Sequence, residues 1–185
     1  MKRALYIFSF FIVLLISCTQ KPFQQRLAEF INDPENKITQ SIKIGKLTAS
    51  TKWLPYAYRH PVAGNVQAAY TQQDDGYCYF DVRFQSEVQE KPAKEKTMYL
   101  DFDMQNDFRL YCAGDSLLPA ICQKIENGQA GNYQYLLAFE NNYRRLDNND
   151  FALIYNDKIF GIGVIAFVYK QQDVKKIPRL KISKG

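Results

Sequence analysis

Ser116 is the side chain whose neighbours come closest to those of a nucleophile, because it stands in the string Gly114-Asp115-Ser116-Leu117. A serine hydroxyl is a weak nucleophile unless an adjacent base removes its proton. The only histidine in the chain is His60, which lies far upstream and precedes Pro61. Gly, Asp and Ser are also ordinary turn residues, since Gly accepts positive φ and the other two bond nearby backbone. We therefore expect a turn here and no catalytic residues.

The same four residues resemble the signature of the GDSL hydrolases. In that family the serine follows the first strand of an α/β fold, and a downstream Asp-x-x-His supplies the base. Here the string lies in mid-chain between two predicted strands, and no histidine follows it. A hydrolase that uses Ser116 is therefore the least favoured of three functions considered for this chain.

Asp101, Asp103 and Asp107 place three carboxylates close together in the sequence, with Asn106 among them. The spacing is similar to that of a calcium loop, but the glycine at the sixth position and the glutamate at the twelfth are missing. Asp101 and Asp103 fall on the polar side of a strand predicted for residues 97–104. We expect a solvated strand face here. A single histidine excludes a histidine-based metal site, and three scattered cysteines disfavour structural zinc, so we expect no metal and no cofactor.

Cys18, Cys78, Cys112 and Cys122 are the four cysteines. If Cys18 carries lipid, as described below, three remain. An oxidising compartment then allows one disulfide and one free thiol, or three buried thiols. Cys112 and Cys122 flank the predicted turn almost symmetrically and form the favoured disulfide candidate. A bridge from Cys78 to either one is the alternative, and Cys78 and Cys112 also have the parity of core residues.

The N-terminal residues have the composition of a secretory signal. Lys2 and Arg3 precede an uncharged run over residues 4–16. This run is too short to span a hydrocarbon core of about 30 Å, which takes about 20 helical residues. It matches the apolar part of a signal peptide. An uncleaved single-pass anchor is the alternative, but Thr19, Gln20 and Lys21 end the apolar run.

Leu15-Ile16-Ser17-Cys18 resembles the lipobox of bacterial lipoproteins. In that family the cysteine receives a diacylglyceryl thioether, the peptide is cut before it, and the new N-terminus is usually acylated. Two or more chains anchor a protein stably, because each buried CH₂ contributes about 0.8 kcal/mol. The resemblance implies a signal peptide over 1–17, a lipidated Cys18 with a tether to residue 22, and one domain over 23–185. An ordinary signal peptide with an unrelated cysteine is the alternative.

The residue after the cysteine bears on localisation. Thr19 is not the aspartate that resembles an inner-membrane retention signal, so the resemblance implies an outer-membrane lipoprotein that faces the periplasm. Removing Lys2 and Arg3 lowers the formal net charge from +5 to +3. A charge this small does not indicate a nucleic-acid partner. The 168 residues that remain are enough for one domain with its own core.

The hydrophobic pattern predicts a short helix followed by many strands. Phe23, Leu27, Phe30 and Ile31 repeat with helical spacing, and Asp33-Pro34 ends the run. We expect this helix to pack on the domain, with a position on the membrane as the rival. The clearest strand covers residues 77–85, where the core face comprises Cys78, Phe80, Val82 and Phe84. The opposite face gives a candidate protein or glycan contact patch, although cross-strand pairing is favoured: Tyr77, Tyr79, Arg83 and Tyr99.

The remaining segments complete a mainly β fold. Residues 161–167 are apolar on both sides and predict a central strand. Short helices are expected over 61–70 and 171–175. Further strands are predicted over 38–53 with a bulge or tight turn at Gly45, and over 97–104, 108–112, 117–125, 133–140, 151–155, 159–170 and 177–182. Eight or nine strands predict an antiparallel β-sandwich or barrel-like domain with one or two short helices.

Three functions follow from these observations. The first is a non-catalytic lipoprotein whose β domain binds a protein partner in an envelope assembly. The second is a small-molecule or glycan binder, if the sheets enclose a pocket. The third is the envelope hydrolase that uses Ser116. The membrane, reached through the lipid on Cys18, and an envelope protein are the expected partners. Fold class alone does not choose among these functions, because β-sandwiches host many of them.

Overall fold

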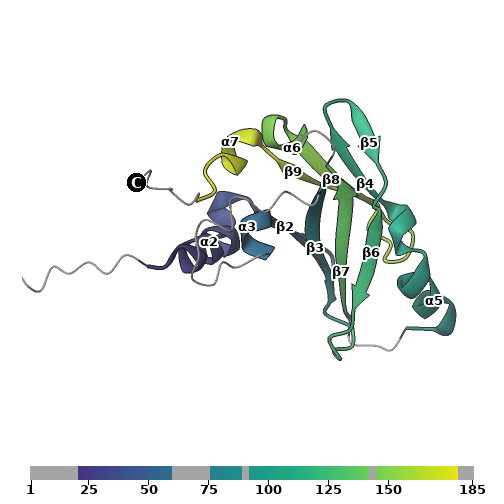
Figure 1. The fold of residues 1–185 in the computed structure, drawn as a ribbon. Coiled ribbons are helices and arrows are strands. Elements are labelled where there is room, and N and C mark those ends of the chain that lie inside the picture. Colours follow the sequence, from purple (N-terminus) through teal and green to yellow (C-terminus); the bar gives the residue numbers. More distant parts are fainter. Residues whose placement is uncertain (1–20, 60–75, 89–91, 142–144, 179–185) are drawn as a thin grey trace, which may run out of the picture.

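The structure is a computed structural model that describes residues 21–59, 76–88, 92–141 and 145–178. Its strands form two antiparallel sheets, which are visible as two layers in Figure 1. The five-stranded sheet contains, in spatial order, β1 (Thr39–Ile44), β2 (Leu47–Leu54), β3 (Tyr77–Ser86), β7 (Asn132–Glu140) and β6 (Ile121–Ile125). The four-stranded sheet contains β5 (Asp115–Leu117), β4 (Phe108–Cys112), β8 (Phe151–Asn156) and β9 (Val164–Tyr169). The predicted fold class is confirmed.

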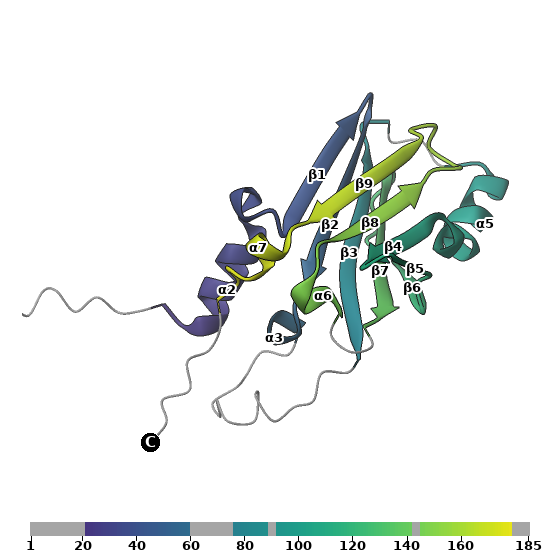
Figure 2. The ribbon, with the colours of Figure 1, turned by 90° about the horizontal axis from the view of Figure 1, so that it is seen from above.

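Short helical segments surround the two sheets. Their bounds are α2 (Phe23–Asn32), η1 (Pro34–Asn36), α3 (Tyr56–Arg59), α5 (Lys94–Phe102), η2 (Met104–Asp107), α6 (Arg145–Asn148) and α7 (Gln171–Val174). Within the described residues, α2 and α5 are the helices of more than one turn, and they lie at opposite ends of the molecule in both views (Figures 1 and 2). The edge strands β1 and β9 lie side by side (Figure 2), where Gln40 Nε2 donates to the Val168 carbonyl at 2.9 Å.

Aromatic side chains fill the space between the sheets. Phe84 on β3 lies 4.7 Å from Tyr155 on β8 and 6.4 Å from Phe108 on β4, measured between ring centroids. A second group surrounds Phe80, whose ring lies 6.2 Å from Phe151 and 5.6 Å from Tyr169. All these rings are 2% exposed or less. Tilted and edge-on aromatic contacts at such distances add about 0.5–1.5 kcal/mol per pair to the burial of area.

The predicted N-terminal helix is confirmed as α2. Leu27 and Ile31 on its inner face are buried, and Phe23 and Phe30 pack partly buried against the core. The helix ends at Asp33, whose extended backbone suits the residue before a proline. Packing of this face on the domain agrees with the favoured expectation.

Residues 97–102 belong to the helix α5, and Met104 begins the 3₁₀ segment η2, so the strand predicted over 97–104 is wrong. Leu100 and Met104 are buried, but Met98 is 53% exposed and Phe102 is 72% exposed. Leu100 and Met104 fit a helix as well as a strand, because residues four apart share a helical face. The stretch from Lys94 to Phe102 is rich in Lys, Glu, Met and Leu, which favour helix, and that propensity decides between the two periods.

The chain after Ser116 does not form the single strand predicted over 117–125, because it divides between the two sheets. Ala113 and Gly114 both have positive φ, which is typical of the two-residue turn of a β-hairpin. The returning strand β5 ends at Leu117, and Pro119 follows, where the missing N–H cannot continue a ladder. The chain then crosses to the five-stranded sheet, where Ile121 pairs with Ala138 on β7.

Two other strand predictions also need correction. Gly45, with φ of 58°, starts a two-residue turn that separates β1 from β2, so residues 38–53 form a hairpin and not one long strand. Gly161 and Gly163 both have φ of 74° and lie in the loop between β8 and β9. β9 is an edge strand and not a central one. The predicted turn of helix at 171–175 is confirmed by α7. The helix over 61–70 and most of the strand over 177–182 lie outside the described residues.

Replacing Phe84 by alanine should lower the free energy of unfolding by about 3–5 kcal/mol, because the cavity would remove contacts to both sheets. Phe84→Leu should cost less, since it keeps part of the volume. The matched control is Tyr111→Ala on the outer face of β4, which should change stability by no more than about 0.5 kcal/mol. Urea unfolding of the three variants measures the difference, and equal effects of Phe84→Ala and Tyr111→Ala would contradict this account of the core.

Candidate functional site

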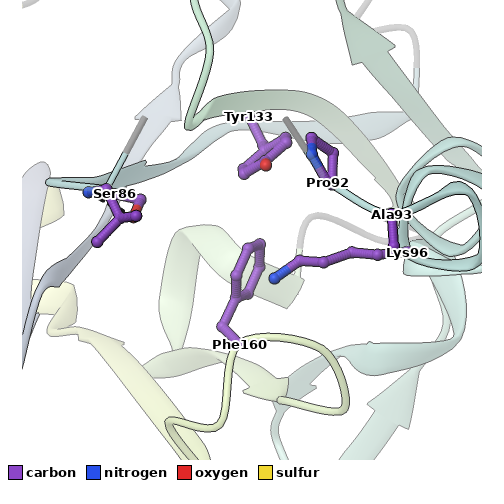
Figure 3. Close-up of a pocket in the computed structure, with 7 residues that line it drawn as sticks. Ser86, Pro92, Ala93, Lys96, Tyr133 and Phe160 are labelled. Atoms are coloured by element: carbon purple, nitrogen blue, oxygen red, sulfur yellow. Dashed lines mark hydrogen bonds between the residues drawn. The ribbon is translucent and has the colours of Figure 1, made fainter. Parts of the chain in front are cut away.

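A pocket of about 280 Å³ opens at the end of the sandwich that carries α5. We call it the Phe160 pocket. Figure 3 shows Lys96 reaching across it from α5, with Phe160 below and Tyr133 above. Lys96 Nζ lies 5.0 Å from the centre of the Phe160 ring, and the Tyr133 and Phe160 rings are 5.6 Å apart. Its walls come from β3, β7, α5 and the β8–β9 loop: Ser86, Val88, Pro92, Ala93, Lys96, Tyr133 and Phe160.

Helix α5 positions Lys96 at the pocket. Leu100 on the inner side of the helix is buried, and its carbonyl accepts a hydrogen bond from the Tyr135 hydroxyl at 2.9 Å. Tyr99 donates to both oxygens of Asp107 at 2.8 Å, which ties the helix to the turn that follows it. These contacts fix the orientation of α5, so that Ala93, just before the helix, and Lys96 in its first turn both line the pocket.

Asp157 positions Phe160 by organising the loop between β8 and β9. Its carboxylate accepts hydrogen bonds from the backbone N–H groups of Ile159, Phe160 and Ile162 at 2.6–2.9 Å, and from the Tyr155 hydroxyl at 2.9 Å. Burial by itself would raise the pKa of Asp157, but these hydrogen bonds together lower it below its ordinary value. The Phe160 ring then stacks on Phe84 at 5.0 Å, which joins the pocket to the aromatic core.

Gly131 lies where the backbone of Ser86–Val88 comes close to the start of β7 at the edge of the pocket. A Cβ on this residue would lie 2.9 Å from the Val88 carbonyl oxygen and 3.3 Å from that of Ser86. Its φ of 74° is also a conformation that side chains rarely adopt. The Gly131 carbonyl accepts a hydrogen bond from the Ser86 N–H at 2.8 Å. The Ser86–Val88 backbone can therefore lie directly against the start of β7, beside Tyr133.

The outward face of the four-stranded sheet is a second notable surface. Arg109 is the one charged residue among the outward positions of β4, β8 and β9, and the others are Tyr111, Ala152, Ile154, Asn156, Val164, Ala166 and Val168. Val164 is 67% exposed, Tyr111 48% and Val168 43%. In Figure 2 no helix of the described chain crosses this face. We call it the outer apolar face.

Ser116 and His60 do not form a catalytic pair in the described structure. Ser116 is an exposed residue of β5 that pairs with Tyr111 across the hairpin. His60 lies outside the described residues. The turn expected for Gly114-Asp115-Ser116-Leu117 is present as the two-residue turn at Ala113 and Gly114, followed by β5.

The acidic residues of 101–107 do not converge on one point. Asp101 accepts a hydrogen bond from Lys124 at 2.6 Å, and Asp103 follows the last turn of α5. Asp107 is fully buried, where it accepts from Tyr99 and pairs with Lys158 at 3.2 Å. Across the described ranges, no three His, Cys, Asp or Glu residues are grouped so that they would hold a metal ion.

The candidate disulfide between Cys112 and Cys122 is not formed, and Cys78 is also free. Cys112 belongs to β4 in the four-stranded sheet, whereas Cys122 belongs to β6 in the five-stranded sheet. The predicted disulfide assumed that residues 108–125 form one hairpin with a cysteine on each strand. The chain instead crosses to the other sheet near Pro119, so the two cysteines lie on strands of different sheets. Burial raises the pKa of Cys122 to about 12, so its thiol stays protonated at neutral pH. Cys18 lies outside the described residues.

The candidate tyrosine patch, which is the less favoured interpretation of the polar face of residues 77–85, is only partly assembled. Tyr77 and Tyr79 are neighbours with ring centroids 6.3 Å apart, and the Arg59 guanidinium lies 3.8 Å from the Tyr79 ring centre. Arg83 binds Asp81. Tyr99 belongs to α5 and binds Asp107, so it is not part of this patch. The strand predicted over 97–104 would have placed Tyr99 on a polar sheet face, whereas the helix directs its hydroxyl to Asp107.

Sequence reasoning missed the residues of the Phe160 pocket. Lys96 lies just before the strand predicted over 97–104, and Phe160 lies inside the strand predicted over 159–170, so the prediction gives no reason for the two side chains to face each other. The predicted strands 151–155 and 159–170 leave room for a short turn, but not for the seven-residue loop that Asp157 organises. The pair of glycines at 161 and 163 was the available signal, because two glycines with one residue between them also suit a loop with positive φ.

Comparison with known proteins leaves the function open. No protein-family model matches the sequence, and no curated protein does. Among solved structures, the chain is similar to a DUF4426 family protein from Pseudomonas aeruginosa, with 11% identity, a TM-score of 0.39, and 72% of this chain and 92% of that chain covered. It is also similar to a protein of unknown function from Burkholderia pseudomallei, with 10% identity, a TM-score of 0.42, and 83% and 88% covered. We draw nothing about function from either similarity.

The helices were also compared with the length that a bilayer requires. None of those in the described residues is long and apolar enough to cross a membrane.

Replacing Asp157 by alanine should destabilise the fold by about 1–3 kcal/mol at pH 7, because three part-buried N–H groups lose their acceptor. Because folding lowers the pKa of Asp157, the carboxylate stabilises the fold fully above the pKa of an unfolded aspartate, about 3.9. This stabilisation is lost as the pH falls through the pKa of Asp157 in the folded protein. Urea unfolding at pH 7 and pH 3 should therefore show a gap between wild type and variant that narrows in acid. Exposed Asp103→Ala is the control, and a pH-independent gap would contradict the assignment.

Proposed function

We propose that this chain is a bacterial lipoprotein, held in the outer membrane through Cys18, whose β domain binds another envelope protein without catalysis. Leu15-Ile16-Ser17-Cys18 supports the anchor, since it follows a charged start and an apolar run of signal-peptide length. The short stretch from Cys18 to Pro22 leads directly into α2. A tether of this length keeps the domain close to the bilayer surface.

The outer apolar face is the observation that carries the binding role. An antiparallel sheet with one face in water normally alternates apolar residues inside with polar residues outside. β9 instead has Ile165, Phe167 and Tyr169 inside, and Val164, Ala166 and Val168 outside. This is the pattern of a strand buried on both faces, and the domain itself buries one of them. A contiguous exposed apolar patch marks an interaction site.

A protein fits this face better than a bilayer does. The outward side chains of β8 and β9 are Ala, Ile and Val with one Asn, so these two strands present no large side chain that would insert among lipids. Flat sheet faces pack against other sheets or helices at close range. Arg109 on the same face hydrogen-bonds the backbone carbonyls of Asn106 and Phe108. A carboxylate on the partner opposite Arg109 would complement its charge.

The two other functions have less support. Aromatic side chains fill the space between the sheets, so a small-molecule or glycan binder would need a site outside the core. The Phe160 pocket is the candidate, and it is treated in the next subsection. A hydrolase would need a base beside Ser116, and the side chains across the hairpin from that residue offer none.

Cys18→Ala should release the protein from the membrane fraction and abolish incorporation of labelled palmitate, because the thioether sulfur is removed. Cys122→Ala is the matched control, since it removes a thiol inside the domain and should leave the protein in membranes. Fractionation and labelling of the two variants test the anchor. Wild-type protein that incorporates no palmitate would overturn it.

Val168→Lys should weaken binding of the partner at least tenfold, which corresponds to about 1.4 kcal/mol, because an unpaired charge would be buried in an apolar interface. Ile121→Lys is the matched control: both residues are 43% exposed, and both point outward from edge strands. The partner is captured on tagged wild-type lipoprotein from detergent-solubilised membranes, and its stoichiometry is measured for each variant.

Comparing capture by the two variants shows whether the partner binds the outer apolar face. Loss of the captured protein in Val168→Lys alone supports the outer apolar face. Equal capture by both variants contradicts it. Sedimentation that finds a homodimer, dissociated by Val168→Lys, would replace the proposed partner with a second copy of this chain.

A further inference from the structure

The Phe160 pocket contains a lysine that pairs with none of the described carboxylates. Lys96 is half-buried, and it forms no ion pair within the described part of the chain. Other described lysines near carboxylates do pair, such as Lys124 with Asp101 at 2.6 Å and Lys158 with Asp107 at 3.2 Å. The contact drawn for Lys96 is with the face of Phe160, as Figure 3 shows. The ammonium group therefore remains available to an anion that enters the pocket.

Two further groups in the pocket favour negative charge. The Tyr133 hydroxyl faces the same space as Lys96 in Figure 3, and burial raises the pKa of Tyr133, which keeps it a neutral hydrogen-bond donor. Ala93 precedes α5 and gives no side-chain cap, so the first N–H groups of the helix have no side-chain acceptor there. The first turn of a helix attracts anions for this reason. Glu95 lies in the same turn but does not line the pocket.

The apolar half of the pocket sets the rest of the ligand. The Phe160 ring already stacks on Phe84 and has the Lys96 ammonium over it, so it offers a ligand its edge, beside the ring of Tyr133 and the side chains of Pro92 and Val88. A flat apolar body against the edge of Phe160 and against Tyr133 would bring a carboxylate attached to it within reach of Lys96 Nζ, which is 5.0 Å from the Phe160 ring centre. The volume of about 280 Å³ lies just below the range of about 300–1,000 Å³ that is usual for ligand sites. The ligand must therefore be small.

We propose that the Phe160 pocket binds a small organic anion, a carboxylate on an aromatic or flat apolar body, with Lys96 and Tyr133 holding the carboxylate and Phe160 the body. The pocket lies at the α5 end of the sandwich, opposite α2, which follows the proposed anchor (Figures 1 and 2). A soluble anion in the surrounding compartment is therefore favoured over a lipid headgroup. This site goes beyond the proposed protein binding and does not depend on the outer apolar face.

Binding of 4-fluorobenzoate to the full lipidated chain in phosphatidylcholine nanodiscs tests the site by ¹⁹F NMR. Wild type should give saturable binding. Neutral 4-fluorobenzyl alcohol and ring-free fluoroacetate should each bind at least tenfold more weakly, because each lacks one half of the recognised ligand. A phosphate monoester, 4-fluorophenyl phosphate, shows whether the pocket prefers carboxylate or accepts both anions.

Substitutions at two lysines in the first turn of α5 distinguish binding at the pocket from a general effect of removing positive charge. Lys96→Gln should weaken 4-fluorobenzoate binding at least tenfold, and Lys96→Arg should retain most of it. Lys94→Gln is the matched control, since it removes the same charge from the exposed first residue of α5, and it should change binding less than twofold. Val168→Lys should bind the probe as wild type does, whether or not it binds a protein partner.

Each remaining outcome has a defined meaning. The proposal is overturned if neither 4-fluorobenzoate nor 4-fluorophenyl phosphate binds saturably to wild type. It is also overturned if Lys96→Gln and Lys94→Gln weaken binding equally. Displacement of the probe when nanodiscs contain phosphatidylglycerol would replace the soluble ligand by a lipid headgroup. Near-UV circular dichroism confirms that each variant is folded, and the pair Lys96→Gln and Lys96→Arg decides the role of the charge.

Discussion

Aromatic contact between the two sheets is the interaction on which the rest of the structure depends. Phe84 from β3 meets Tyr155 from β8 and Phe160 from the following loop at 4.7 and 5.0 Å. Large rings bury much area for little loss of side-chain freedom, and their tilted contacts add direction to the packing. The sheets are held at a fixed separation by these rings, and the space between them is filled.

Filling the core with tyrosines requires that their hydroxyls find partners, and this requirement shapes the end of the sandwich. Tyr155 donates to Asp157, and Tyr135 donates to the Leu100 carbonyl on α5. An unpaired buried hydroxyl would cost about 1–3 kcal/mol. The same hydrogen bonds that satisfy the core therefore also fix the β8–β9 loop and α5. Those two elements carry Phe160 and Lys96, so the pocket inherits its geometry from the core.

The two surfaces singled out above differ in position and in chemistry. The outer apolar face extends across β4, β8 and β9, whereas the Phe160 pocket is concave, partly charged and at the α5 end. A lipid on Cys18 would place α2 nearest the bilayer and leave both surfaces accessible from the surrounding compartment. A domain of this kind would be able to hold a protein partner along one face and a small anion at its end, without either site obstructing the other.

The sequence by itself determined the elements in which the spacing of apolar residues agrees with the signals that begin or end the element. β3 and β4 alternate cleanly, and α2 combines helical spacing with a stop at Asp33-Pro34, so their burial followed from the pattern. The proposed anchor rests likewise on a local string, Leu15-Ile16-Ser17-Cys18. Only the tertiary structure decided residues 97–104, where both periods fitted Leu100 and Met104, and the crossing after Leu117, which depends on the partner strand β7. It also decided that β9 lies at an edge and that Lys96 faces Phe160. The reason is that pairing and exposure depend on residues far apart in the chain, which no local spacing records.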